Sequence, residues 1–180
     1  MADGLNLKVT WTQQGPGFGG LAARLPAAIA AGLNEGGEQV RAQVQRALWK
    51  QTGAKSYASI TRRVQVTKAG GAAVTGGGAV LAYSINVAGR PVMKLSEFNW
   101  KQTNRGVQAN VWGVPHNFKR SFVLNGVPKA RLGPERLPIR TLYGPNLAKE
   151  LSRGATPAAF ASAARAYIPP AILKHIRSAL

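Results

Sequence analysis

The chain has no cysteine and only six acidic residues among its 180. Without cysteine it can form no disulfide bond, no thiolate metal site and no cysteine nucleophile. Its two histidines, His116 and His175, have no Asp or Glu around them at metal-ligand spacing. The sequence therefore predicts no metal site.

The shortage of carboxylates also limits catalysis. Glu97 and Glu135 are the only acids in the middle of the chain, and no pattern places them together as a general acid and base. Ser96 and Ser121 lack the Gly-x-Ser-x-Gly context of an activated serine. The glycine-rich stretch 70–78 lacks the Gly-Lys-Ser/Thr ending of a phosphate-binding loop and is expected to be only a loop. We expect no enzyme, no cofactor and no small-molecule substrate.

Long apolar runs are missing as well. Residues 1–6 lack the basic and apolar regions of a secretory signal, and no run of about 18 apolar residues follows. We therefore expect a chain made in the cytoplasm, with no membrane partner.

Basic residues are abundant by contrast: 24 Lys and Arg give a formal net charge of +18. Self-repulsion of this size implies a polyanion or a complementary protein surface that neutralises it. The excess is spread through the chain rather than held in a tail, which favours a folded basic surface, although charge pairs can also form only a solvated face. The cations expected to face DNA or an acidic partner are Arg62, Arg63, Lys101, Arg105, Lys119 and Arg120.

The hydrophobic pattern predicts one domain with extensions. Residues 7–11 alternate as a short strand does, and residues 21–48 have the period of a long helix that ends near Gly53. Within it, Gly32, Gly36 and Gly37 leave two alternatives open: the helix breaks there, or another backbone comes close.

The rest of the chain alternates short strands with turns. A short helix is expected within 55–61, and strands over 62–67, 80–87, 107–112 and 122–124, the first two joined as a wide hairpin. Two late helices, over about 156–167 and 170–179, are expected to be separated by Pro169 and Pro170, with Thr156 as the N-cap of the first.

The predicted fold class is α+β: a long N-terminal helix packed on a mostly antiparallel sheet of about four or five strands, with a C-terminal helical extension. The expected organisation is a strand or arm over 1–20, a core domain over 21–135, an extended docking segment over 136–155 and the helical extension over 156–180. Six aromatic residues could either fill this core, which we favour, or stack on single-stranded bases. They are Tyr83, Phe98, Trp100, Trp112, Phe118 and Phe122.

One segment resembles a known family. Residues 136–146 read Arg-Leu-Pro-Ile-Arg-Thr-Leu-Tyr-Gly-Pro-Asn. They are similar to the Arg-Leu-Pro-Ile and Leu-Tyr-Gly-Pro-Ser signature of the prophage minor tail protein Z family, the tail-completion proteins of lambda-like long-tailed phages. Residues 52–64, 89–98 and 106–122 resemble further family motifs in the same order, so the likeness covers about residues 40–150. The chain departs from the family pattern at Val92, Met93 and Asn146, and residues 151–180 match no part of it.

The resemblance implies a structural virion protein of the neck or upper tail. Proteins of this family are added late, at the head-proximal end of a finished tail, and make it competent to join a filled head. It implies a ring of copies that follows the sixfold symmetry of the tail, with other neck and tail proteins such as the tail terminator, the tube or the head–tail connector as partners. Genomic DNA in the channel is a further, sequence-independent partner. The alternative is a free basic nucleic-acid-binding protein.

The prolines of this segment suggest how it acts. Pro134, Pro138 and Pro145 are expected to keep the backbone out of regular structure, so that an extended arm can dock on a neighbouring subunit or partner. The alternative is that the segment packs on its own domain. The residues expected to dock are Arg136, Leu137, Pro138, Ile139, Arg140, Leu142, Tyr143, Gly144 and Pro145.

Overall fold

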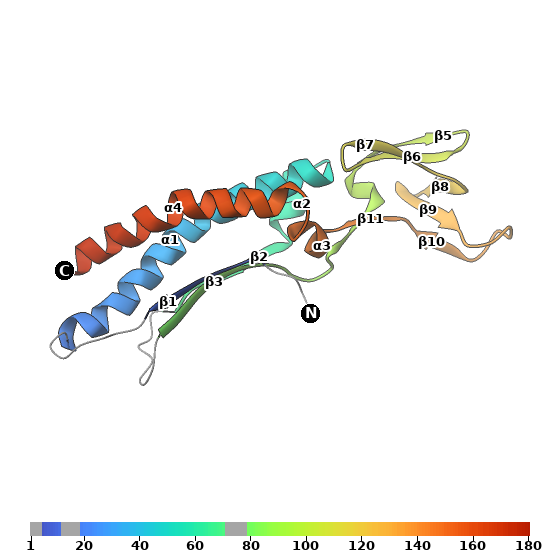
Figure 1. Ribbon diagram of the computed structural model, residues 1–180. Coiled ribbons are helices and arrows are strands. Elements are labelled where there is room, and N and C mark those ends of the chain that lie inside the picture. Colours follow the sequence, from blue (N-terminus) through green and yellow to red (C-terminus); the bar gives the residue numbers. More distant parts are fainter. Residues whose placement is uncertain (1–4, 12–18, 71–78) are drawn as a thin grey trace.

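Two long helices lie side by side along one part of the molecule, and a β-rich lobe extends beyond them (Figure 1). The computed structural model describes residues 5–11, 19–70 and 79–180. Helix α1 (Gly19–Thr52) runs toward the lobe, and α4 (Ala155–Ala179) runs back from it, so that the C-terminus lies at the end of the molecule remote from the lobe. The molecule is therefore elongated, with different surfaces at its two ends.

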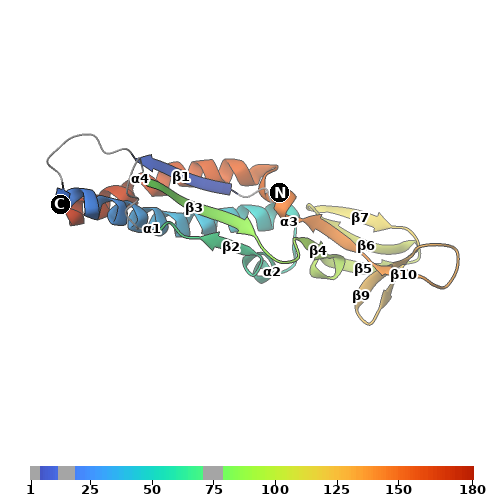
Figure 2. The same cartoon turned by 90° about the horizontal axis from the view of Figure 1, so that it is seen from below.

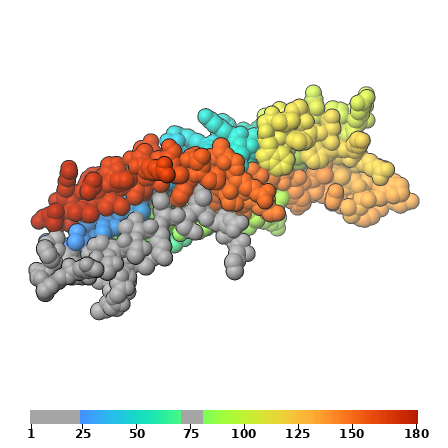
Figure 3. Space-filling view, viewed as in Figure 1, coloured from blue at the N-terminus to red at the C-terminus, as the bar shows by residue number. Residues whose placement is uncertain are grey.

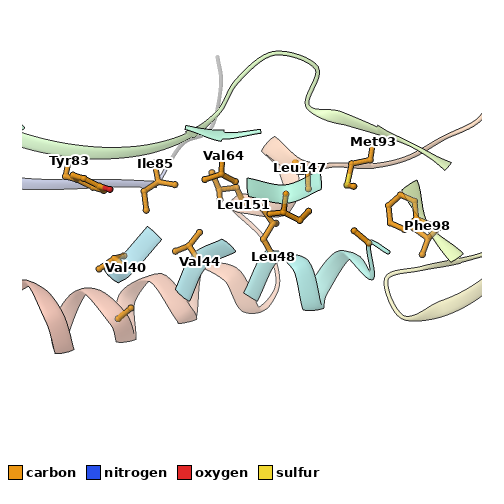
Figure 4. Close-up of a cluster of buried hydrophobic side chains, with 14 of the residues drawn as sticks. Val40, Val44, Leu48, Val64, Tyr83, Ile85, Met93, Phe98, Leu147 and Leu151 are labelled. Carbon is orange, nitrogen blue, oxygen red and sulfur yellow. The ribbon is translucent and has the colours of Figure 1, made fainter. Parts of the chain in front are cut away.

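Helix α1 is organised by apolar residues four positions apart. Val40, Val44 and Leu48 are fully buried on one face, and Figure 4 shows them pointing toward the strands. The helix ends at Thr52, and the next residue, Gly53, has a φ of +72°, in the left-handed region that commonly terminates helices. The long helix predicted from the periodicity is confirmed.

The glycines of α1 mark a close approach and not a break. A Cβ on Gly32 would lie 2.5 Å from the Cα of Ile172, and one on Gly36 would lie 2.9 Å from the carbonyl oxygen of Tyr167. Gly37 faces the ring of Tyr83. Because α1 continues through all three positions, the alternative of a broken helix is wrong.

Helix α4 is continuous, which corrects the prediction of two helices. Pro169 and Pro170 lie inside it. The two prolines remove intrahelical hydrogen bonds, but the adjoining turns pack against α1 at Gly32 and Gly36, so tertiary packing overrides the local preference.

The start of α4 also differs from the prediction. The N-cap is Gly154 instead of Thr156, and the side-chain oxygen of Gln51 accepts hydrogen bonds from the backbone N–H groups of Ala155 and Thr156, at 3.0 and 3.2 Å. The end of α1 thus supplies the capping oxygen for α4.

A three-stranded antiparallel sheet covers one side of the helix pair (Figure 2). Its strands follow the order β1 (Leu5–Trp11), β3 (Ala79–Val87), β2 (Val64–Thr67). Leu81, Tyr83 and Ile85 alternate along β3 and are buried, as a strand with one face on a core requires. Strands β2 and β3 pair as expected, whereas the predicted loop over 70–78 falls almost wholly outside the described residues.

The lobe consists of two further three-stranded antiparallel sheets. One contains β5 (Asn99–Thr103), β6 (Gly106–Val111) and β7 (Val114–Phe118), and the other β8 (Ser121–Leu124), β9 (Val127–Arg131) and β10 (Ile139–Thr141). The backbone N–H of Val107 donates to the hydroxyl oxygen of Ser121 at 2.7 Å, which ties the two sheets together.

Short elements join the lobe to the helices. They are α2 (Tyr57–Thr61), β4 (Val92–Lys94), the 3-10 helix η1 (Leu95–Glu97), β11 (Tyr143–Asn146) and α3 (Leu147–Leu151). Met93, Phe98 and Leu147 are almost fully buried among them, so one core runs from the helices into the lobe (Figure 4). The α+β class is confirmed, with the strands divided among small sheets of two or three instead of a sheet of four or five.

Candidate interaction surface

The lobe carries a strong excess of positive charge. Residues 99–146 contain eight Lys and Arg but a single acid, Glu135, a formal charge of +7. In the described part of the chain, none of the eight forms an ion pair. They are Lys101, Arg105, Lys119, Arg120, Lys129, Arg131, Arg136 and Arg140.

The two acids of α1, Glu35 and Glu38, already have cationic partners. Glu35 on α1 accepts from the ammonium of Lys174 at 2.8 Å and lies 2.6 Å from His175 Nε2 on α4. The hydrogen bond from Lys174, followed by that from His175, lowers the pKa of Glu35. Glu38 pairs with Arg41 at 3.0 Å on the same helix. These carboxylates stabilise the helical part and leave the charge of the lobe uncompensated.

Three of the predicted cations gather at one end of sheet β5-β6-β7. Arg105 lies in the turn that precedes β6, and Lys119 and Arg120 lie in the turn that follows β7. Val107 and Phe118 are directly paired across β6 and β7, so both turns lie at the same end of the sheet. Lys101 is exposed on the adjoining strand β5. The structure therefore assembles four of the six predicted cations in the lobe.

Arg63 does not belong with the cations that were predicted to face DNA or an acidic partner. Its guanidinium makes two hydrogen bonds of 2.8 Å to the carboxylate of Glu97, and it also donates to the carbonyl of Ser59 at 2.7 Å. Both partners of the ion pair are largely buried. Arg63 thus fastens α2 to the 3-10 helix and does not face a partner. Arg62 is exposed, outside the lobe, and donates to the carbonyl of Ala58 at 3.2 Å.

The segment 136–145 is not a free arm. Residues 139–141 form β10, which pairs with β9, and residues 143–146 form β11, which pairs with β4. Pro138 directly precedes a strand, and Pro145 lies where the pairing of β11 is irregular, two places where a strand tolerates proline. The expectation that prolines exclude regular structure here is therefore wrong at Pro145, which lies inside β11, whereas Pro134 and Pro138 lie outside the strands as predicted.

Part of this segment belongs to the core. Leu142 is buried, and its N–H donates to the carbonyl of Pro128 at 3.0 Å. A Cβ on Gly144 would lie 2.9 Å from the ring of Phe98, and Pro145 is buried. Leu142 and Pro145 are buried and not available for docking, which corrects their assignment. Those that remain accessible are Arg136, Leu137, Pro138, Arg140 and Tyr143, with Ile139 and Gly144 half-buried.

Shallow hollows surround the accessible residues. One of about 360 Å³ is lined by Phe122, Leu124, Arg131, Arg136, Leu137 and Ile139. Another, of about 470 Å³, shares Phe122 and Arg131 with it. A third, of about 600 Å³, is lined by Phe118, Arg140, Thr141, Leu142 and Tyr143. The space-filling view shows the lobe as one end of the elongated molecule (Figure 3).

Sequence reasoning missed Leu124 and Arg131 as surface residues, and it favoured the core for Phe122, which lines the surface hollows. The alternation of β9, in which Pro128 and Ala130 are buried while Arg131 is exposed, was the available signal for Arg131. The guanidinium of Arg131 lies over the ring of Phe122, 5.6 Å from its centroid. This contact depends on strand pairing, which the sequence pattern did not specify.

The aromatic residues divide between core and surface. Tyr83 and Phe98 are buried, and Trp100 and Phe118 pack partly buried against the core. Trp112, by contrast, is 46% exposed and contacts His116 edge-on. Phe122 lines the surface hollows and is not part of the core cluster. The core assignment therefore holds for four of the six residues and fails for Trp112 and Phe122.

Within residues 5–11, 19–70 and 79–180, no group of three or more His, Cys, Asp or Glu could hold a metal ion. Over the same residues, no helix combines the length and apolar character that a membrane span requires. Comparison with family models, curated proteins and solved structures gave no match to this chain.

Proposed function

We propose that this chain is a structural protein of a phage particle, a minor tail protein of the tail-completion type. It assembles as a ring at the head-proximal end of the tail and supports head–tail joining and the passage of DNA. The observation that carries the proposal is the position of the motif that resembles the minor tail protein Z family: its exposed residues Arg136, Leu137 and Arg140 lie on a lobe of formal charge +7.

The shape and charge of the molecule suit this role. In a ring, each elongated subunit presents one end toward its axis or its neighbour along the tail. Lys101, Arg105 and Lys119 are exposed and can neutralise DNA phosphates without reading bases, so contact with DNA would be independent of sequence. DNA that passes through a channel needs contacts of this kind, because sequence-specific contacts would bind particular DNA sequences and hold the DNA in place.

The docking residues supply the contacts with other proteins. Leu137 is 67% exposed and Tyr143 is 53% exposed, which leaves apolar surface that assembly can bury. Partners include further copies of this chain, arranged with the sixfold symmetry of the tail, and neck or tail proteins such as the tail terminator, the tube or the head–tail connector. The role is structural, without catalysis and without a cofactor.

The second candidate is a free, sequence-independent nucleic-acid-binding protein, which the +7 charge of the lobe favours equally. The two differ in where the protein is found. Phage particles purified from the host that expresses the chain should contain it in a fixed ratio to the tail proteins. A protein that binds duplex DNA tightly as a monomer or dimer, and is absent from purified particles, would contradict the first function and support the second.

A further inference from the structure

The outer face of sheet β8-β9-β10 carries two adjoining hollows. The hollow of about 360 Å³ contains Leu124, Leu137 and Ile139. The hollow of about 470 Å³ contains Gly133 and Pro134. Arg131 and Phe122 line both, so the stacked pair forms the wall between them. An extended chain that crosses this wall would enter both hollows.

Strand pairing explains why these side chains meet. Ile139 and Arg131 lie directly opposite each other across β10 and β9, so their side chains project from the same face. Phe122 lies opposite Lys129 across β8 and β9 and projects from that face too. A single sheet face therefore presents aliphatic, aromatic and cationic groups together.

The apolar part of this face is unusually accessible. Leu137 is 67% exposed and Leu124 is 39% exposed, and both line the hollow of about 360 Å³. Exposed apolar residues that occur singly need no explanation, but two leucines and Ile139 around one hollow indicate an interaction site. A partner that covers them gains the free energy of removing their surface from water.

The charged side chains that line this face are all positive. Arg120, Arg131 and Arg136 line the hollows, and no acidic residue lines either of them. Glu135, the only acid of the lobe, is exposed in the adjoining loop and forms no ion pair with any described residue. A complementary partner must therefore bring negative charge.

We propose that this face binds an extended acidic segment of another protein. The segment inserts apolar side chains into the two hollows and places carboxylates against Arg131 and Arg136. Arginine suits this contact because its planar guanidinium can hold a carboxylate through two hydrogen bonds. The inference rests on the proposed docking role and narrows it: the partner at this face is an acidic protein.

A second copy of this chain does not supply such a segment. It has six acidic residues, and no two of them are adjacent in the sequence. Glu35, Glu38 and Glu97 are already engaged in ion pairs. Two copies of a lobe with charge +7 would also repel each other. Contacts between copies in the proposed ring must therefore use other surfaces.

A nucleic acid fits this face less well than a protein does. Recognition of single-stranded bases relies on accessible aromatic rings, and the ring of Phe122 is already covered by Arg131. The other apolar residues of the hollow are aliphatic: Leu124, Leu137 and Ile139. Aliphatic hollows accept the apolar side chains of a peptide, whereas the phosphates of DNA have other exposed cations in the lobe.

The test is fluorescence anisotropy on the full chain with three labelled probes. The first is a synthetic peptide of glutamates with leucine at every third position. The second has serine in place of each leucine, and the third is an oligothymidine of matched charge. We expect the leucine peptide to bind at least about tenfold tighter than the serine peptide, because leucines that enter the hollows remove apolar surface from water. Equal binding of the two peptides, or an oligothymidine whose binding is weakened by Leu137→Ser as much as that of the leucine peptide, would overturn the proposal.

Variants locate the binding site. Leu137→Ser should weaken the leucine peptide about tenfold, and Arg136→Gln should weaken both peptides. Leu173→Ser is the matched control, since Leu173 is 54% exposed on α4, away from the lobe, and this change should leave every affinity unaltered. If Leu137→Ser has no effect on the leucine peptide, the assigned face is wrong.

These outcomes are separate from the proposed function. Selective peptide binding by a protein that is absent from phage particles would leave the acidic-segment site standing and refute the virion role. If the protein is present in particles but does not bind the leucine peptide selectively, the virion role stands and the acidic-segment site is refuted.

Discussion

The backbone N–H of Trp112 donates to the carbonyl oxygen of Thr52 at 2.9 Å. Thr52 is the last residue of α1, and Trp112 begins the turn between β6 and β7. The hydrogen bond satisfies a carbonyl that the helix end would otherwise leave without a partner. It also fastens the lobe to the longest helix, so the basic surface is held in a defined position relative to the helical part.

The first prediction concerns this junction. Gly53 has a φ of +72°, and a Cβ there would lie 3.0 Å from the backbone nitrogen of Gly113. Gly89 has a φ of +71° but nothing within 4 Å of such a Cβ. Gly89→Ala should therefore lower the free energy of unfolding by about 1 kcal/mol through backbone strain alone. Gly53→Ala should lower the free energy of unfolding by more than this, because the added Cβ also disturbs the junction. Urea unfolding measures both, and equal losses would argue against a tight junction.

The second prediction concerns the contact between the long helices. In an isolated helix, replacing Gly32 by Ala would stabilise by about 1 kcal/mol. Here the added Cβ would lie 2.5 Å from the Cα of Ile172, so we expect a loss of about 1–3 kcal/mol instead. Gln39→Ala, at an exposed position of the same helix, should change stability by less than about 0.5 kcal/mol. A stabilising Gly32→Ala in thermal or urea unfolding would contradict the observed packing.

The third prediction is that Arg62 and Arg63, which are adjacent in the sequence, contribute differently to stability. Arg63→Met leaves the largely buried carboxylate of Glu97 without its cation and should lower the free energy of unfolding by about 2–3 kcal/mol. Arg62→Met, at an exposed position, should change it by no more than about 0.5 kcal/mol. If urea unfolding gives the same loss for both variants, the ion pair does not stabilise the fold as described.

The fourth prediction is a dependence on alkaline pH. Burial raises the pKa of Tyr83 above its ordinary value of 10.0, and the carboxylate of Glu38 adds to the effect. The folded chain therefore retains a proton that the unfolded chain loses. The free energy of unfolding is therefore unaffected by the ionisation of Tyr83 below about pH 10. Above that pH it declines by up to about 1.4 kcal/mol per pH unit, because unfolding then releases the proton.

The matched variant is Tyr83→Phe. The hydroxyl of Tyr83 is buried and makes no hydrogen bond to any described residue, so its removal should leave stability at pH 7 unchanged or raise it by up to about 1 kcal/mol. Unfolding followed from pH 8 to pH 11 should show a smaller alkaline decline in the variant. Identical declines in the two proteins would exclude Tyr83 as the cause.

The fifth prediction concerns DNA. Replacing Lys101, Arg105 and Lys119 by Gln should weaken binding to duplexes of any sequence. The slope of log affinity against log salt concentration should also become shallower by about 0.9 for each lost phosphate contact. A control triple variant at the exposed residues Lys149, Arg153 and Arg165, outside the lobe, removes the same charge. Equal reductions in fluorescence titrations over a salt series would mean that binding follows net charge and not the lobe.

The periodic elements of this fold were predictable because their signals are local. Val40, Val44 and Leu48 place a helical face on the core, and the alternation around Tyr83 and Ile85 predicts a strand with one buried face. Both patterns survive in the folded chain because burial acts on the same side chains that produce the pattern.

The prolines show where local rules fail. Pro169 and Pro170 predict a helix end, yet packing against Gly32 and Gly36 keeps α4 continuous. Pro145 predicts an irregular segment, yet β11 accommodates it beside an irregular pairing. In each case a partner distant in sequence decides the structure, and a single sequence does not identify that partner.

The candidate surface was predictable only in part for the same reason. Net charge identified Lys119 and Arg120, but the ion pair between Arg63 and Glu97 joins residues 34 positions apart and has no local signal. The contact of Arg131 with Phe122 likewise depends on strand register, which the short strands of the lobe do not reveal in sequence.

The central claim is that this chain is part of a phage particle. The most direct measurement is electron microscopy of particles purified from cells that express the chain with an affinity tag at its C-terminus, which lies remote from the lobe. Labelled density at the head-proximal end of the tail, arranged with the tail's sixfold symmetry, is the predicted result. Particles without the protein, or with label at the distal tip, would contradict it.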